Sequence, residues 1–244
     1  MNFRAIETIA VRGNEIAFTG AVPPSTFSRY SETARWLMFR DPVARERVRL
    51  GGGVARAHHQ ELLRDVTYPS TLRFETTIAR LGRTSIDMLH HIVRVDDETH
   101  VASTRVTIVQ LGPDGPSPID PSMAEFVTPS ESAAPLVFEP GPPEFETTIF
   151  ARPSDQDQFR HVNQARYVDF ADDVRWLAHV AGNEAGFEEP IGRVSVDYRR
   201  EVKAGTVLRA ELRRGSGSSR SIRLVESATG VETTRIVLAP RDPR

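Results

Sequence analysis

The sequence predicts an α+β protein in which one unit, a long antiparallel sheet with a single helix, occurs twice. Two observations predict this architecture. The two halves of the chain resemble each other block by block, and a proline-rich stretch separates them. The 244 residues, 39% of them hydrophobic, are enough to bury two modest cores. We therefore expect two domains that share one fold.

Three blocks of the first half recur in the second half in the same order. The longest match pairs TLRFETTIARLGRTSIDM with VLRAELRRGSGSSRSIRL. The matched blocks lie 136, 130 and 140 residues apart and start at these pairs of positions: Thr71 and Val207, Val101 and Val231, Arg35 and Arg175. Because the offsets differ only by the length of a loop, they favour a true duplication.

The stretch between the copies, from Gly112 to Phe145, is rich in proline. Proline fixes its own φ angle and has no amide hydrogen, so it supplies no donor to a helix or sheet. This composition predicts an extended linker over the surface. We place the boundary near Pro129, with an N-terminal unit at 1–128, a linker at 129–145 and a C-terminal unit at 146–244.

Each half predicts the same order of elements: a short strand, a loop, one helix and then several strands. The first strands are expected at Glu15 to Thr19 and at Glu146 to Ala151. Segments such as VSVDYRREVKAGTVLRAELRR mix β-branched residues with alternating charge and break at glycine, which predicts antiparallel strands. The helix of the second half is indicated by apolar residues at helical spacing: Tyr167, Phe170, Val174 and Leu177.

Composition excludes several classes of function. The chain has no cysteine, which excludes disulfides, thiolate metal sites and cysteine nucleophiles. A net charge of −2 and a pI of about 6.4 argue against a nucleic-acid partner. No signal peptide and no apolar run of membrane-spanning length is present, so we expect a cytoplasmic protein. Neither a G-x-S-x-G motif nor metal-ligand spacing of histidines occurs, and we expect no metal.

The most informative motif lies where the first strand of the second half gives way to its helix. It is in the segment FARPSDQDQFRHVNQARYVDFADDVRW. It resembles the 4-hydroxybenzoyl-CoA thioesterase-like branch of the hotdog superfamily, with its pattern D-x-D-x-x-G-H-V-N-N-x-x-Y and a helical acidic pair. Together with the repeat, the chain is similar to the double-hotdog acyl-ACP thioesterases. The resemblance implies a tandem hotdog. The matching residues are Asp155, Asp157, His161, Val162, Asn163, Tyr167, Asp172, Asp173 and Arg175.

The resemblance also implies hydrolysis of an acyl thioester, carried by coenzyme A or by acyl carrier protein, without a cofactor. Asp157 would be the general base or nucleophile, and His161 would orient the water or bind the carbonyl. Unpaired amides at a helix N-terminus would polarise the carbonyl, which we place near Val162 and Asn163. The alternatives are a turn-forming Asp157, a structural His161 and an Asn163 that only caps the helix.

Two positions depart from the family pattern. Arg160 stands where the family usually has glycine, and it could bind a phosphate of coenzyme A or of a carrier's phosphopantetheine. Phe159 stands where the plant-type acyl-ACP enzymes carry a polar residue. We include Phe159, Arg160, Val162 and Tyr167 in the expected substrate-binding set.

The first half has neither a carboxylate nor a histidine between Thr19 and Tyr30, so we expect that it has lost its own site. In a pair of hotdog units, the first half would still form one wall of the substrate pocket. His58 and His59 are its candidates for substrate contact. The alternative is that they occupy ordinary positions on an exposed strand.

Two other functions stay open at this point. One is a non-catalytic acyl-thioester sensor or carrier-binding module, and the other is hydration or dehydration of an enoyl or hydroxyacyl thioester. The D-x-x-x-H spacing of Asp157 and His161 fits the thioesterase pattern better than the hydratase pattern, which has one more residue. The pseudo-dimer within one chain could act alone or associate further.

Overall fold

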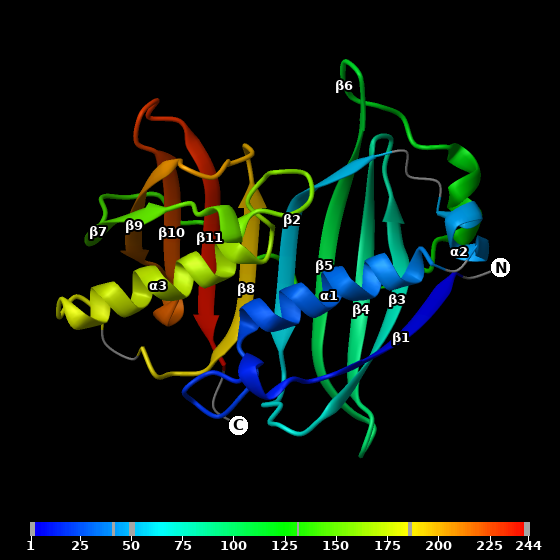
Figure 1. The fold of residues 1–244 in the computed structure, drawn as a ribbon, viewed down its shortest axis with the longest axis horizontal. Helices are drawn as coiled ribbons and strands as arrows, with labels where there is room; N and C mark the ends of the chain where they lie inside the picture. The colour runs from blue at the N-terminus through cyan, green and yellow to red at the C-terminus, as the bar shows by residue number, and fades with distance from the viewer. Residues whose placement is uncertain (1–2, 41, 49–51, 131, 185–186, 242–244) are drawn as a thin grey trace. The chain divides into compact units, whose positions relative to one another are not determined.

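The computed structural model describes residues 3–40, 42–48, 52–130, 132–184 and 187–241. The chain divides into two compact units, Met1–Ala134 (unit 1) and Pro135–Arg244 (unit 2). Each unit has one antiparallel sheet, and one long helix lies across a face of that sheet (Figure 1). This confirms the predicted α+β class.

In unit 1 the helix α1 packs against β1, β2 and β3. The strand order in the sheet is β1-β3-β4-β5-β2, and β6 pairs with the end of β5. The elements are β1 (Arg4–Ala10), η1 (Gly13–Glu15), α1 (Pro24–Met38), α2 (Pro42–Arg47), β2 (Gly53–Leu62), β3 (Thr71–Leu81), β4 (Ser85–Arg94), β5 (Thr99–Gly112), β6 (Gly115–Pro116) and η2 (Pro121–Phe126).

In unit 2 the helix α3 packs against β7, β9 and β11. The strand order is β7-β9-β10-β11-β8, which is the order of unit 1 with each strand replaced by its counterpart. The elements are β7 (Phe145–Phe150), η3 (Pro153–Asp155), α3 (Arg166–Val180), β8 (Ile191–Tyr198), β9 (Val207–Arg214), η4 (Ser216–Ser218), β10 (Arg220–Glu226) and β11 (Glu232–Pro240).

The first strand of unit 1 is not where the sequence predicted it. The predicted strand, Glu15 to Thr19, begins in η1 and continues as loop and turn. The strand is β1, whose residues alternate between exposed and partly buried and pair with β3 from Arg4↔Thr77 to Ala10↔Thr71. This alternation in burial has the period of a half-buried strand. The sequence does not show it, because Ile6 lies on the exposed side and Glu7 on the partly buried side.

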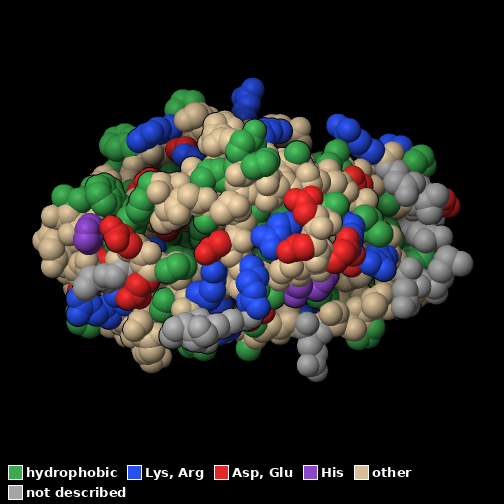
Figure 2. All heavy atoms as spheres, turned by 90° about the horizontal axis from the view of Figure 1, so that it is seen from below, with side chains coloured by type: hydrophobic (Ala, Val, Ile, Leu, Met, Phe, Trp, Pro, Cys, Tyr) green, Lys and Arg blue, Asp and Glu red, His purple; other side chains and the backbone are tan. Residues whose placement is uncertain are grey.

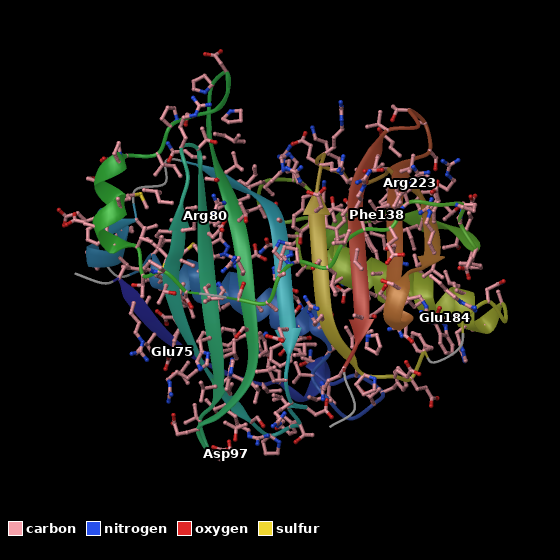
Figure 3. All side chains as sticks on the ribbon, turned by 180° about the vertical axis from the view of Figure 1, so that it is seen from behind. Glu75, Arg80, Asp97, Phe138, Glu184 and Arg223 are labelled. Atoms are coloured by element: carbon pink, nitrogen blue, oxygen red, sulfur yellow. The ribbon has the colours of Figure 1, made fainter. Side chains whose placement is uncertain are left out.

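The proline-rich stretch is an extended linker only in part. Its first half belongs to unit 1, because β6 pairs with β5 and the 3-10 helix η2 inserts Met123, with no exposed surface, into the core. The prediction of a surface linker is therefore wrong for 112–127. In unit 2, the extended part places the Phe138 ring against the guanidinium of Arg235. The guanidinium carbon lies 4.7 Å from the centroid of the ring. Figure 3 shows Phe138 on the sheet face opposite α3.

The buried face of α3 largely follows the predicted helical spacing. Tyr167, Phe170 and Val174 are buried, and each such side chain contributes roughly 1.5–3 kcal/mol to folding. Leu177, the last residue of that spacing, is 39% exposed and lies off the buried face. Ala178, four residues after Val174, takes the inward position instead.

None of the described helices is long and apolar enough to span a bilayer. Figure 2 shows acidic and basic side chains interspersed over one face of the molecule, in keeping with the small net charge of −2.

Candidate active site

Asp157 and His161 oppose each other in a short hairpin between η3 and α3. The Asp157 amide donates to the His161 carbonyl (3.0 Å), and the Arg160 amide donates to the Asp157 carbonyl (3.0 Å). Gln156 and Val162 form an antiparallel bridge at the base of the hairpin. Directly opposed residues of an antiparallel pair project from the same face with Cβ atoms about 5 Å apart. The hairpin therefore presents the Asp157 and His161 side chains together.

Arg160 closes this hairpin in the left-handed conformation, with φ of 63°. A three-residue hairpin loop needs one left-handed residue after its turn, and glycine adopts that conformation without steric cost. This explains why the family pattern has glycine at the position. Arg160 and Phe159 are both exposed at the tip, and Phe159 exposes 58% of its surface.

The Asp157 carboxylate uses its two oxygens differently. Oδ1 accepts a hydrogen bond from the Phe159 amide (2.8 Å), the turn-forming role that the sequence left open. Oδ2 has no hydrogen-bond partner among the residues that the structure describes, and the side chain is only partly buried. The same residue can therefore hold the turn with one oxygen and contact a water molecule with the other.

His161 is held by a carboxylate that the sequence analysis missed. Its Nε2 lies 2.8 Å from Oε2 of Glu201, and the two side chains are 33% and 56% exposed. Glu201 follows β8, far from His161 along the chain, so no sequence spacing connects them. A carboxylate that accepts from one ring nitrogen fixes the orientation of the imidazole and leaves the other nitrogen, Nδ1, for a second contact.

Asp155 anchors the base of the hairpin. It is 1% exposed, and its carboxylate accepts hydrogen bonds from the Arg152 amide (2.8 Å) and from Nε and Nη2 of Arg166 (3.0 and 2.7 Å). Its carbonyl accepts from the Asn163 amide (2.8 Å). One buried residue thus joins both ends of the hairpin to the start of α3.

The carbonyl site expected near Val162 and Asn163 stays a prediction, but the amides of these two residues already have partners. The Val162 amide donates to the carbonyl of Val202 (2.8 Å), and the Asn163 amide is taken by Asp155. Asn163 acts as a turn former ahead of the helix, because its Oδ1 accepts from the Ala165 amide (2.9 Å). The Gln164 amide, which has no partner among the described residues, remains as a donor there.

Tyr167 places a hydroxyl near the two carboxylates. It is 3% exposed and packs edge-on against Phe170 and Tyr198, with ring centroids 5.9 and 5.4 Å apart. Burial raises the pKa of Tyr167, and the nearby charges of Asp157 and Glu201 raise it further. The hydroxyl therefore stays protonated and can donate a hydrogen bond.

The candidates of unit 1, His58 and His59, lie on β2. His58 has no exposed surface, so the alternative of an exposed strand position is wrong for it. Burial, followed by the charge of Arg35, lowers the pKa of His58 to about 3, and the ring is neutral at pH 7. Contact of either histidine with substrate stays a prediction. Within the described residues, no cluster of three or more histidine and carboxylate side chains is arranged to hold a metal ion.

Each unit consists of a sheet crossed by one long helix, and a hairpin with Asp157 and His161 precedes the second helix. This arrangement defines a tandem hotdog enzyme. Two family models match the halves: the Thioesterase-like superfamily over residues 11–127, and the acyl-ACP thioesterase C-terminal domain over residues 142–237. The chain belongs to the hotdog thioesterase superfamily, and it is a thioester hydrolase.

Solved structures agree with this fold along the whole chain. The 12:0-ACP thioesterase from Umbellularia californica is 18% identical, with a TM-score of 0.78 over 98% of this chain and 97% of that one. An acyl-ACP thioesterase from Bacteroides thetaiotaomicron VPI-5482 is 13% identical, with a TM-score of 0.78 over 98% of both chains. A MaoC-like dehydratase from Phytophthora capsici is 12% identical, with a TM-score of 0.53 over 79% and 72%. No curated protein shows significant sequence similarity to this chain.

Proposed function

We propose that the protein hydrolyses fatty acyl thioesters of acyl carrier protein, with acyl-CoA as a second donor of the same acyl group. The observation that carries the proposal is the hairpin that presents Asp157 beside His161, with Glu201 holding the imidazole. The carrier is proposed from the match of unit 2 to the acyl-ACP thioesterase C-terminal domain and from the two acyl-ACP thioesterase structures. A cytoplasmic location stays a prediction.

In the proposed reaction, Oδ2 of Asp157 removes a proton from a water molecule as the water oxygen attacks the thioester carbon. Nδ1 of His161, the ring nitrogen away from Glu201, orients this water. The negative charge that develops on the carbonyl oxygen is stabilised by the Gln164 amide at the start of α3. Collapse of the intermediate breaks the carbon–sulfur bond, and the proton held by Asp157 passes to the leaving thiolate.

Arg160 supports recognition of the phosphopantetheine arm, which acyl-CoA and acyl-ACP share. It is exposed at the tip of the hairpin that carries Asp157, and its guanidinium can donate two hydrogen bonds to one phosphate. Arg160→Ala should therefore raise KM for both thioesters and leave kcat unchanged.

The test is thiol release from a chain-length panel of acyl-ACPs and acyl-CoAs by wild type and Asp157→Ala. We expect the variant to be slower by about 100-fold or more, the range that loss of a general base produces. Asp114→Ala, which removes an exposed carboxylate of unit 1, is the matched control and should keep the wild-type rate. Equal rates for wild type and Asp157→Ala would contradict the proposal.

The same experiment separates the alternatives. Saturable binding of acyl-ACP without thiol release would indicate a sensor. A change in enoyl-CoA absorbance, without thiol release, would indicate hydratase chemistry. A higher kcat/KM with acyl-CoA than with acyl-ACP would overturn the proposed carrier but keep the reaction.

A further inference from the structure

Unit 1 has a cavity on the face of its sheet opposite α1. Phe74 packs edge-on against Tyr30 of α1, with ring centroids 6.4 Å apart, so its neighbour Glu75 projects from the other face of the sheet. Figure 3 views this face and labels Glu75. The cavity has a volume of about 650 Å³, which is within the usual range for a small-molecule site. All of its lining residues belong to unit 1.

Four of the lining residues form one row across the sheet. Glu61 on β2 pairs with Ser103 on β5. Ser103 pairs with His91 on β4, and His91 pairs with Glu75 on β3. Directly paired residues project from the same face. The row therefore has a carboxylate at each end, with a hydroxyl and an imidazole between them.

The two carboxylates of the row differ in their partners. Glu75 lies 2.7 Å from the guanidinium of Arg4 and 3.0 Å from that of Arg73. Glu61 is partly buried, and it has no hydrogen-bond or ion-pair partner among the residues that the structure describes. Withdrawing a charge from water is unfavourable unless the charge is paired. Glu61 is therefore the group in this cavity that a cation would stabilise most.

A pair of imidazoles lies beside this carboxylate. The rings of His91 and His100 have centroids 3.7 Å apart, and both line the cavity. Nε2 of His100 lies 3.0 Å from the Ala102 carbonyl, which can only accept, so Nε2 carries the hydrogen. Burial lowers the pKa of His100, so the ring is neutral at pH 7 and its Nδ1 is an acceptor. The pair therefore offers a flat surface and a further acceptor.

Unit 2 contains the same row, and backbone hydrogen bonds identify it. The Val101 carbonyl accepts from the Leu63 amide, and the Thr233 carbonyl accepts from the Arg199 amide. Val101 and Leu63 are therefore the structural equivalents of Thr233 and Arg199. The sequence match had placed Val101 with Val231, two residues earlier on the same face of the strand.

The row of unit 2 follows from this equivalence. Two residues before Leu63 and Arg199 come Glu61 and Asp197. Two residues after Val101 and Thr233 come Ser103 and Arg235, and each pairs with its carboxylate neighbour. Continued through the same strand pairings, the row of unit 2 consists of Asp197, Arg235, Arg223 and Glu211. The carboxylates at both ends are kept, but two guanidinium groups replace the hydroxyl and the imidazole.

These guanidinium groups pair with carboxylates in unit 2. Arg223 lies 2.6 Å from Glu211, and Arg235 lies 2.7 Å from Glu232. The Phe138 ring covers the Arg235 guanidinium on the outer side. Unit 1 lacks both guanidinium groups, and its cavity lies over the row where unit 2 has them.

We propose that the cavity of unit 1 binds a small ligand that carries a guanidinium group, with Glu61 as its counter-ion. The planar guanidinium can donate two parallel hydrogen bonds to the carboxylate and stack on an imidazole ring. The ligand then supplies the kind of group that unit 2 supplies from its own side chains. This inference does not rest on thioester hydrolysis, and it adds a binding site on unit 1 that takes no acyl group.

The test is titration of the full chain with butylguanidinium, followed by NMR of the ring protons of His91 and His100. We expect saturable shifts with a dissociation constant of about 1–10 mM, which a ligand of this size can reach. Glu61→Gln keeps the shape and removes the charge, so it should weaken binding by about ten-fold or more. Butylurea, which has a similar shape and no charge, should give no saturable shift. The inference is overturned if butylguanidinium does not bind, or if butylurea binds equally well.

Glu125→Gln is the matched control, because Glu125 is an exposed carboxylate of unit 1 that does not line the cavity. It should bind butylguanidinium as wild type does. Equal affinities of wild type and Glu61→Gln, or equal losses in the two Gln variants, would contradict the role of Glu61. If Glu61→Gln fails to fold, Ser103→Arg serves instead, because it introduces the residue of unit 2. Its guanidinium should pair with Glu61 and abolish binding, and an unchanged affinity would equally overturn the inference.

Discussion

The Asp157 amide donates to the His161 carbonyl, so the two residues stand opposite each other across a three-residue loop. This relationship explains the D-x-x-x-H spacing in physical terms. With four residues between them, the two side chains would no longer be directly opposed, because a shift of one position moves a side chain to the other face. The spacing is therefore the requirement for presenting a carboxylate and an imidazole together.

Arg160→Gly should stabilise the protein by about 1 kcal/mol, because it relieves a left-handed conformation that is unfavourable for a residue with a Cβ atom. Arg160→Ala keeps the Cβ atom and should give no such gain. Urea unfolding of both variants measures the difference. Equal stability of the two would contradict the role assigned to the backbone conformation.

Glu201→Ala should lower kcat by roughly ten-fold and leave KM nearly unchanged, because the imidazole of His161 loses the partner that orients it. Glu201→Gln keeps an acceptor for Nε2 and should recover part of the rate. Lys203→Ala removes the more distant contact of Glu201, at 3.4 Å, and should behave as wild type. A purely structural Glu201 would instead show the same kcat in all three variants.

Asp155→Asn should destabilise unit 2 by roughly 2 kcal/mol, because hydrogen bonds to a buried charged group are among the stronger ones. Asp169→Asn is the matched control: Asp169 also pairs with Arg166, but it is more exposed. Thermal unfolding should show a clearly larger loss for Asp155→Asn. Similar losses would mean that Asp155 does not anchor the segment.

Acid should destabilise unit 1 through His58 and His90. Burial keeps the pKa of His58 at about 3, whereas the unfolded chain titrates near its usual 6.5. As pH falls from 6.5 towards 3, His58 binds a proton in the unfolded state but not in the folded state. The free energy of unfolding therefore falls by up to about 1.4 kcal/mol per pH unit for this group.

The measurement is urea unfolding of wild type and His58→Val across this pH range. The variant should lose stability less steeply as pH falls, since one of the two histidines is gone. Parallel slopes for the two proteins would show that His58 does not carry the effect.

Much of the fold could be predicted because its signals are periodic. The matched blocks identified the strands β3, β4 and β5 with β9, β10 and β11, and apolar spacing found α3, whose buried face continues through Ala178 and not Leu177. The strand β1 was missed because its sequence, RAIETIA, does not alternate between polar and apolar residues, although its burial does. The core role of Met123 was missed because proline composition indicates a loop but does not show whether that loop packs into a core.

The site could be predicted only where the motif is local. Asp157 and His161 are four residues apart, and a short hairpin joins them. Glu201 could not be found, because its contact with His161 depends on how β8 ends beside the hairpin. The amides of Val162 and Asn163 looked available from the sequence, but their partners, Val202 and Asp155, become visible only in the folded chain.

The most direct test of the account is the kcat of Asp157→Asn on the best acyl-ACP substrate. An asparagine oxygen can still accept from the Phe159 amide, so this change removes the charge and keeps the turn. The account predicts an unchanged melting temperature and a kcat lower by about 100-fold or more. A kcat equal to that of wild type would contradict it.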